Sequence, residues 1–286
     1  MTDEQPTAEF KEQRPHLRAV AYRMLGSVCE ADDAVQEAWL RASRANTSDV
    51  EDMCAWLTTV VARVSLNMLR SRRSKREEPL GVHVPEPIVS SEDGLQPEHE
   101  ALLADSVGLT LLVVLETLNP AERLAYVLND MFAMPFDDIA PIVERSPAPT
   151  RQLASRARRR VEGEAAVPDP DLGRQREVVG AFTAASREGN FERLVAVLHP
   201  DVVLRANMAL GVSRHVRGAE AVARQARMYH TLDRFSRPAL VNGTAGIVVA
   251  SGERIYAVMG FTVADGKIVA IDILADPPRL EQLALA

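Results

Sequence analysis

The side chains with the clearest chemical pattern lie on a helix predicted from about residue 147 to Val161. At 100° per residue, one face of this helix collects small and apolar residues: Thr150, Leu153, Ala154, Ala157 and Val161. The opposite face and its flank carry hydrogen-bonding and cationic side chains: Arg151, Gln152, Ser155, Arg156 and Arg159. Guanidiniums bind phosphates, and Gln and Ser bond to base edges, so this face suits the major groove of a DNA duplex.

The residues before this helix can position it. Apolar residues between Phe136 and Val143 follow the spacing of a short amphipathic helix. Ser146 then precedes Pro147, the order expected where a serine caps a helix and a proline occupies its first turn. A solvated arginine-rich helix would carry the same charge. The tandem of short helix, tight turn and basic helix nevertheless favours a helix-turn-helix.

The rest of the sequence offers little that would carry catalysis. It contains no glycine-rich phosphate loop, no cluster of metal ligands and no nucleophile elbow. Asp272 shares a predicted strand face with Ile268, Ala270 and Leu274, so it is a candidate general base or ligand contact. Acids at strand ends are as often hydrated at a rim. We therefore predict no catalytic residue, no metal site and no cofactor.

Length and composition limit the number of domains and the location that can be expected for the protein. With 286 residues the chain has room for about two or three domains. No apolar run reaches membrane-spanning length, and the first residues lack the pattern of a signal peptide, so we expect a cytoplasmic protein without membrane contact. Cys29 and Cys54 are expected to be small buried residues rather than a disulfide.

Positive charge is concentrated in two places, although the formal net charge is -7. One basic run covers residues 70–76 and the other covers residues 151–160, with an acidic segment between them. Two local basic sites on an acidic chain predict two contacts with one polyanion.

Residues 1–76 are predicted to form a helical domain, with helices over about residues 10–25, 31–42 and 53–73. The second helix buries one continuous face. Its other side presents four residues in a narrow arc: Asp33, Gln36, Glu37 and Leu40. An apolar residue ringed by polar ones is typical of a protein-docking face, but it is equally the pattern of an isolated surface leucine.

The third helix of this domain carries a second outward band: Trp56, Thr59, Arg63, Asn67 and Arg70. A tryptophan among arginines suits unpaired bases, because the ring stacks on a base and the guanidiniums bind phosphates. The alternative is a tryptophan that covers the edge of the domain's own core beside solvated arginines.

The remaining chain divides by composition. Residues 77–100 are predicted to be a polar linker, and residues 101–164 a four-helix domain that ends in the helix-turn-helix. Residues 174–275 predict an α+β cone, with helices over a curved antiparallel sheet that includes a hairpin turning at Asp265-Gly266. Residues 276–286 form a tail without an evident place in that core. We expect the cone and tail to pack against the first domain or the linker.

In combination, the motifs resemble those of a known family. The segment Cys29–Arg41 resembles the polymerase-docking helix of the extracytoplasmic-function (ECF) sigma factors of bacterial RNA polymerase, and Trp56–Arg76 resembles their −10 element helix. Leu118–Arg123, Pro135–Ile139 and Ser146–Arg160 are similar to the region that reads the −35 element. The resemblance implies a multidomain protein with two all-α sigma domains, and core RNA polymerase and promoter DNA as its partners.

Residues 174–275 resemble the SnoaL-like branch of the nuclear-transport-factor-2 (NTF2) fold, a fusion that marks the SigJ-type subgroup. The subgroup's Trp-Leu-Pro-Glu-Pro motif is matched in part at residues 83–87 and its C-terminal motif in part at 275–280, whereas its Asp-Gly-Gly-Gly motif is absent at 207–211. This implies a non-enzymatic promoter-specificity subunit, modulated in cis by a third domain that contacts the sigma domains. The rival hypothesis is a DNA-tethered SnoaL-like cyclase or isomerase with Asp272 as base.

Overall fold

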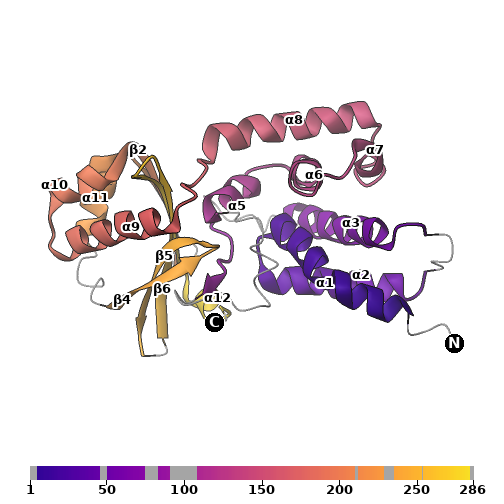
Figure 1. Cartoon of the computed structure of the whole chain (residues 1–286), viewed down its shortest axis with the longest axis horizontal. Helices are drawn as coiled ribbons and strands as arrows, with labels where there is room; N and C mark the ends of the chain where they lie inside the picture. The colour runs from indigo at the N-terminus through magenta and orange to yellow at the C-terminus, as the bar shows by residue number, and fades with distance from the viewer. Residues whose placement is uncertain are drawn as a thin grey trace. The chain divides into compact units, whose positions relative to one another are not determined.

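The computed structural model describes residues 5–45, 50–74, 83–90, 108–209, 212–228, 235–252 and 254–283, with side chains from residue 10 onward (Figure 1). The chain divides into two compact units. Unit 1 comprises Met1–Glu78, Pro97–Ala104 and Val114–Gly163, and unit 2 comprises Pro79–Gln96, Asp105–Val113 and Glu164–Ala286. The predicted domain of residues 1–76 thus falls in unit 1, whereas residues 79–96 of the predicted linker and residues 105–113 of the predicted second helical domain fall in unit 2.

Three helices form the first half of unit 1: α1 (Gln5–Leu25), α2 (Val28–Ala42) and α3 (Met53–Ser74). α1 stops before Gly26, whose φ of 69° favours glycine, and Ser27 caps α2 by accepting a hydrogen bond from the Glu30 N–H. The three predicted helices are therefore confirmed. The prediction for Cys29 was wrong, because this residue lies on the exposed side of the first turn of α2.

Two arginines tie these three helices together. The Arg18 guanidinium lies 2.8 Å from the Asp32 carboxylate and joins α1 to α2. Arg72, near the end of α3, pairs with Glu30 and donates to the main-chain carbonyl of Leu25. Arg72 is therefore part of the scaffold, although the sequence places it in a basic run.

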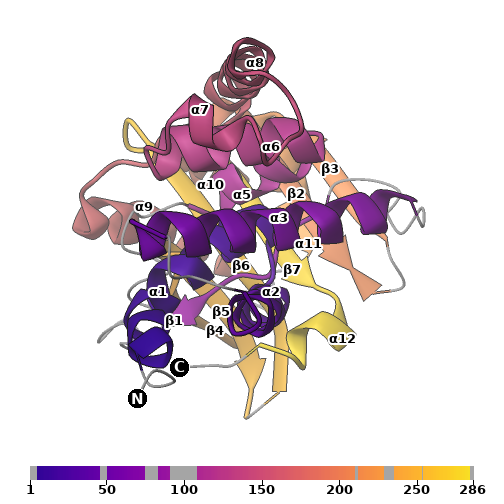
Figure 2. The same cartoon turned by 90° about the vertical axis from the view of Figure 1, so that its right-hand side faces the viewer.

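The second half of unit 1 contains α6 (Pro120–Tyr126) and the π-helical turn η1 (Val127–Met131), followed by the two helices of the helix-turn-helix, α7 (Phe136–Ile139) and α8 (Pro147–Glu164). α6 lies between α8 and α3 in both views (Figures 1 and 2). The buried residues of α8 are the predicted ones: Thr150, Leu153, Ala154, Ala157 and Val161. α7 is shorter than predicted and ends before Pro141, because proline has no N–H with which to continue the helix.

Arg123 of α6 joins the two halves of unit 1. It is only 2% exposed, and its guanidinium donates two hydrogen bonds of 3.1 Å to the main-chain carbonyl of Arg23 in α1. Its third nitrogen lies 2.7 Å from the carboxylate of Glu116. Because this buried guanidinium is paired with both the Glu116 carboxylate and the Arg23 carbonyl, it holds α6 against α1.

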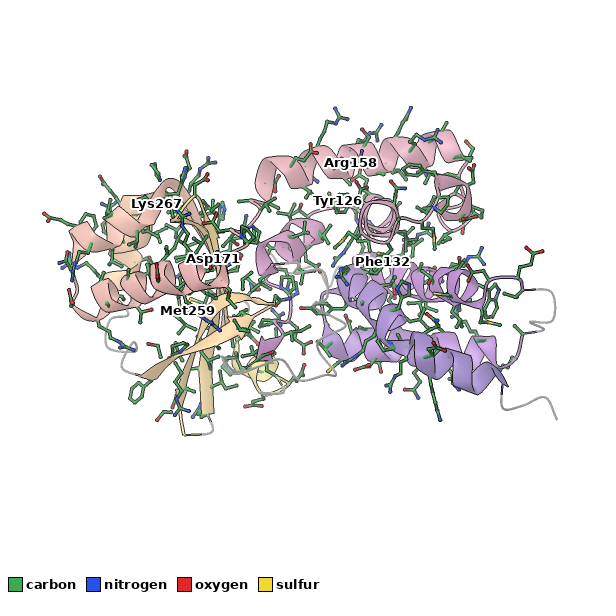
Figure 3. All side chains as sticks on the ribbon, in the orientation of Figure 1. Tyr126, Phe132, Arg158, Asp171, Met259 and Lys267 are labelled. Atoms are coloured by element: carbon green, nitrogen blue, oxygen red, sulfur yellow. The ribbon has the colours of Figure 1, made fainter. Side chains whose placement is uncertain are left out.

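Phe132, which follows η1 and is labelled in Figure 3, adds an aromatic contact to this joint. The Arg23 guanidinium lies 5.1 Å from its ring centroid, and the His16 ring packs edge-on at 5.3 Å. Burial, and secondarily the charge of Arg23, lowers the pKa of His16 below 6.5, so the neutral ring is favoured there.

Among the described residues, unit 2 holds a 7-stranded sheet in the order β1-β4-β5-β6-β7-β2-β3, in which β2 and β7 are parallel and the other pairs antiparallel. Its strands are β1 (Val89–Ser90), β2 (Leu198–Met208), β3 (Ser213–Arg217), β4 (Ser236–Val241), β5 (Thr244–Ser251), β6 (Arg254–Ala264) and β7 (Lys267–Ala275). One face is covered by α9 (Leu172–Arg187), α10 (Phe191–Val197) and α11 (Ala219–Met228), and the short α12 (Pro277–Leu280) follows β7. The α+β fold class predicted for this part of the chain is confirmed.

The predicted hairpin is also confirmed. β6 and β7 pair up to Ala264 and Lys267, and the two turn residues Asp265 and Gly266 have φ values of 52° and 71°, as a type I′ turn requires. Strands β3, β4 and β5 were not predicted. Residues 244–250 of β5 are all buried, so the strand lacks the alternation that identifies a half-exposed strand.

Part of the predicted linker belongs to the sheet, which corrects the expectation that it forms no core. Val89 of β1 pairs with Val241 of β4, and the amides of Ile88 and Asn242 donate to the Asn242 side chain and the Ile88 carbonyl at 3.1 and 2.8 Å. Val84 to Ser90 are all buried. This strand could not be predicted from the sequence because its apolar stretch is short and lies among polar residues. Its hydrogen-bonding partners are also far away in sequence.

Helix α5 (Leu109–Glu116) begins in unit 2, where it covers the second face of the sheet. A Cβ atom placed on Gly260 of β6 would lie 3.0 Å from the Leu109 side chain, so any larger residue here would push this side chain of α5 away from the sheet. Val258 and Thr262, on the same face of β6 as Gly260, are also buried, and the Thr262 hydroxyl lies 2.8 Å from that of Thr110 in α5. The sheet therefore has two buried faces.

Candidate polymerase and nucleic-acid interfaces

The outward face of α2 is as the sequence predicted. Asp33, Gln36, Glu37 and Leu40 are all exposed, and Leu40 retains 42% of its accessible area. Glu37 forms an ion pair of 2.8 Å with Arg41, one turn later on the same helix. A solvated i,i+4 ion pair contributes little stability, so Glu37 and Arg41 can exchange it for other partners at low cost. The face therefore consists of one exposed apolar side chain, Leu40, surrounded by polar side chains that are free to change their contacts.

The α3 band is graded from half-buried to exposed. Trp56 and Thr59 are half-buried, and the Thr59 hydroxyl donates to the Ala55 carbonyl at 3.0 Å, whereas Arg63, Asn67 and Arg70 are exposed. A half-buried indole packs part of its ring on the domain and presents the rest for stacking. Of the basic run at 70–76, Lys75 and Arg76 lie outside the described residues.

The outward face of α8 carries the five predicted DNA-contacting residues, all exposed: Arg151, Gln152, Ser155, Arg156 and Arg159. The Arg151 guanidinium lies 5.3 Å from the Phe136 ring centroid, which orients it at the start of the helix. The guanidinium of Arg159 is 3.4 Å from the Ser155 carbonyl. These arginines are held locally and remain open to a phosphate.

Arg158 differs from its neighbours on α8 because it is paired with an acidic residue of η1. Its guanidinium lies 2.6 Å from the carboxylate of Asp130, and both Arg158 and the nearby Tyr126 are labelled in Figure 3. The hydrogen bond and the charge of Asp130 raise the pKa of Arg158. Arg158 therefore serves to hold α8 against η1.

Two arginines that the sequence did not single out as ligand contacts join this surface. A cleft of about 600 Å³ within unit 1 is lined by Arg70 and Arg73 of α3, Arg145 of the turn before α8, and Arg156 of α8. Arg70 and Arg73 belong to one basic run of the sequence and Arg156 to the other, and only the tertiary fold brings these two runs together with Arg145. Glu144, which precedes Arg145 in this turn, has a φ of 59°, a left-handed conformation that its residue type does not announce in the sequence.

Asp272 of β7 is a structural residue of unit 2. It is 1% exposed, its carboxylate lies 3.1 Å from the Arg205 guanidinium, and it accepts a hydrogen bond of 2.6 Å from Thr110 of α5. Thr110 also lies 2.8 Å from the hydroxyl of Thr262. Burial raises the pKa of Asp272, against the opposing influence of Arg205 and Thr110. A carboxylate enclosed in this way has no access to a substrate.

No helix of the described residues is long and apolar enough to cross a membrane.

Comparisons with known proteins agree with this architecture. Residues 10–75 match the family model for Sigma-70 region 2. The chain is 40% identical to the ECF RNA polymerase sigma factor SigJ of Mycobacterium tuberculosis, over 95% of this chain and 92% of that protein. It is 32% identical to the probable ECF RNA polymerase sigma factor SigI of the same species, over 97% and 95% of the two chains. The crystal structure of M. tuberculosis SigJ matches with a TM-score of 0.79 at 35% identity, covering 98% of this chain and 100% of that one.

Proposed function

The chain belongs to the ECF sigma factors of RNA polymerase, and we propose that it directs core polymerase to its promoters through the outward faces of α2, α3 and α8. In this proposal the α2 face docks on core polymerase. The α3 band holds the unpaired −10 strand, and α8 enters the major groove of the −35 element. The observation that supports this division best is that each face lies on its own helix of unit 1, exposed throughout on α2 and α8 and half-buried to exposed on α3.

If α3 and α8 bind separate promoter elements at the same time, unit 1 must open between these two helices. The −10 and −35 elements lie at separate places along a duplex that rises about 3.4 Å per base pair. Arg70 of α3 and Arg156 of α8, however, line one cleft in the closed unit. The hydrogen bonds of Arg123 to the Arg23 carbonyl must therefore break when both elements are bound at once.

The enzymatic alternative has less support. A general base must reach a substrate, and Asp272, the residue that the alternative needs, is enclosed by Arg205 and Thr110. We therefore extend the proposal to a non-enzymatic, regulatory role for unit 2.

We propose that unit 2 acts in cis through the segment that connects the two sigma regions. Arg279 of α12 donates to the Val84 carbonyl at 2.7 Å and also contacts the Asn207 side chain at 3.4 Å. The Val84 amide in turn donates to the Asn207 side chain. This holds the connecting segment at the edge of unit 2 and limits how far the two sigma regions can separate. Contact of unit 2 with the sigma regions themselves remains a prediction.

Substitutions on α8 test the −35 assignment. Gln152→Ala or Ser155→Ala is expected to change which −35 sequences are preferred, because amide and hydroxyl groups read base edges. Arg159→Ala is expected to weaken all promoters alike and to reduce the slope of log affinity against log salt by about one unit, because a phosphate contact carries no sequence information. Selection of bound DNA from a random library by each reconstituted holoenzyme measures both effects. Equal loss of sequence preference in all three variants would refute the assignment.

A substitution in α12 tests the cis role of unit 2. Arg279→Gln removes a charge-assisted hydrogen bond, so amide hydrogen exchange in residues 83–90 is expected to become about tenfold faster. Transcription with core polymerase should change in parallel. Arg224→Gln, which removes an exposed arginine of α11 in the same unit, is the matched control. Faster exchange with unchanged transcription would show that holding this segment has no regulatory effect.

A further inference from the structure

We infer that the arginine-lined cleft of unit 1 binds a linear polyphosphate group in the free protein. The residues that carry this inference are Arg70, Arg73, Arg145 and Arg156. Two of them come from α3 and two from the helix-turn-helix, so the site is complete only while the two sigma regions are closed on each other. Neither region alone presents this set.

The charge of the cleft is strongly one-sided. Against four guanidiniums, its lining contains one carboxylate, that of Glu122, and a second, that of Glu144, lies 3.9 Å from Arg70. An adjoining cleft of about 440 Å³ shares Glu122 and Arg156 and adds Arg159 and Arg160. On a chain with a net charge of -7, this is a local positive site at which like charges are brought together by closure. A multivalent anion relieves that repulsion.

The kind of anion follows from the donors and from the shape. Guanidiniums match phosphate oxygens with paired, charge-assisted hydrogen bonds, and four of them around about 600 Å³ suit a chain of phosphates better than a single small anion. No aromatic side chain is among the described residues that line the cleft, so there is no platform on which a base would stack. Recognition therefore goes through the phosphates, whether they belong to inorganic polyphosphate or to a nucleoside triphosphate.

Occupation of the cleft would oppose promoter binding. Arg70 and Arg156 hold the same anion from the two sides of the closed unit, whereas on a promoter they are drawn apart to separate elements. A ligand that binds only the closed state stabilises that state and lowers the population able to open. A polyphosphate bound in the cleft would thus keep the free sigma factor in the closed state, which does not bind a promoter.

Calorimetric titration of the full chain with sodium tripolyphosphate, at fixed ionic strength and without DNA or polymerase, tests this inference. We expect one saturable site, with affinity at least about tenfold above that for sulfate. Arg73→Gln and Arg145→Gln lie on opposite sides of the cleft, and each should weaken binding about tenfold through loss of a charge-assisted pair. Arg44→Gln, at an exposed arginine after α2, removes the same charge from unit 1 and should leave binding unchanged.

A parallel titration with ATP separates the two sources of the phosphate chain. Equal affinity for ATP and tripolyphosphate means that the phosphates alone are recognised, and tighter binding of ATP identifies a nucleoside triphosphate; both support the site. Absence of a saturable site overturns the inference. So does a loss confined to Arg145→Gln, which would place the anion on the helix-turn-helix alone, or an equal loss in Arg44→Gln, which would indicate non-specific attraction. Because no promoter or polymerase is present, failure here leaves the proposed function untouched.

Discussion

Leu40→Asp is expected to abolish binding to core RNA polymerase, with a loss of at least about 100-fold, while the melting temperature stays nearly constant. Leu40 is 42% exposed on α2, so a carboxylate there remains hydrated and costs the fold little. At the centre of a docking face the same carboxylate would have to be desolvated among the acidic side chains of Asp33 and Glu37. Surface-immobilised core polymerase and a thermal melt of each variant give the two quantities.

Val167→Asp is the matched control for this experiment. Val167 is an apolar residue that is 84% exposed outside the α2 face, so the same change should leave both polymerase binding and stability unaltered. If Leu40→Asp unfolds the protein, Leu40 is a core residue. If it folds and still binds polymerase normally, the docking face lies elsewhere.

Asp272→Ala is expected to destabilise unit 2 by about 3–5 kcal/mol, because it leaves the Arg205 guanidinium buried without its counter-charge. The expected effect is structural, so chemical denaturation followed by circular dichroism is the appropriate measurement. Asp272→Asn keeps the shape and part of the hydrogen bonding, and should be less destabilising. Transcription with the Asp272→Asn variant should decrease only in proportion to its loss of folded protein.

Asp201→Ala provides the comparison within the same unit. Asp201 also faces an arginine, Arg217, at 3.4 Å, but both side chains are 68% exposed, so its loss should cost no more than about 1 kcal/mol. Equal stabilities of the Asp272→Ala and Asp201→Ala variants would contradict the buried pair. A catalytic role for Asp272 would instead require an activity that Asp272→Asn removes while the protein stays folded.

The local faces of the helices could be predicted from the sequence because each is set by the spacing of residues on one helix. The outward arc of α2 around Leu40 and the buried stripe of α8 are both as predicted. The same reasoning found the β6–β7 hairpin, since the Asp265-Gly266 pair selects its own turn type. None of these features needs knowledge of a distant partner.

What could not be predicted depends on residues far apart in sequence. Ile88 is held by Asn242, and Val84 by Asn207 and Arg279, so the inclusion of the linker in the sheet is invisible to periodicity. Asp272 was correctly placed on an apolar strand face, but its burial depends on Thr110 of α5. Likewise, the arginine cleft depends on the packing of α6 against the first three helices, to which the bonds of Arg123 to the Arg23 carbonyl contribute.

Run-off transcription with purified core polymerase tests the central claim most directly. A template selected by the holoenzyme from random DNA is transcribed with the full chain and with the Leu40→Asp, Arg159→Ala and Val167→Asp variants. The account predicts a single start site that depends on the full chain, is lost with Leu40→Asp, is weakened with Arg159→Ala and is unchanged with Val167→Asp. Promoter-independent transcription, or transcription that is indifferent to both Leu40→Asp and Arg159→Ala, would contradict it.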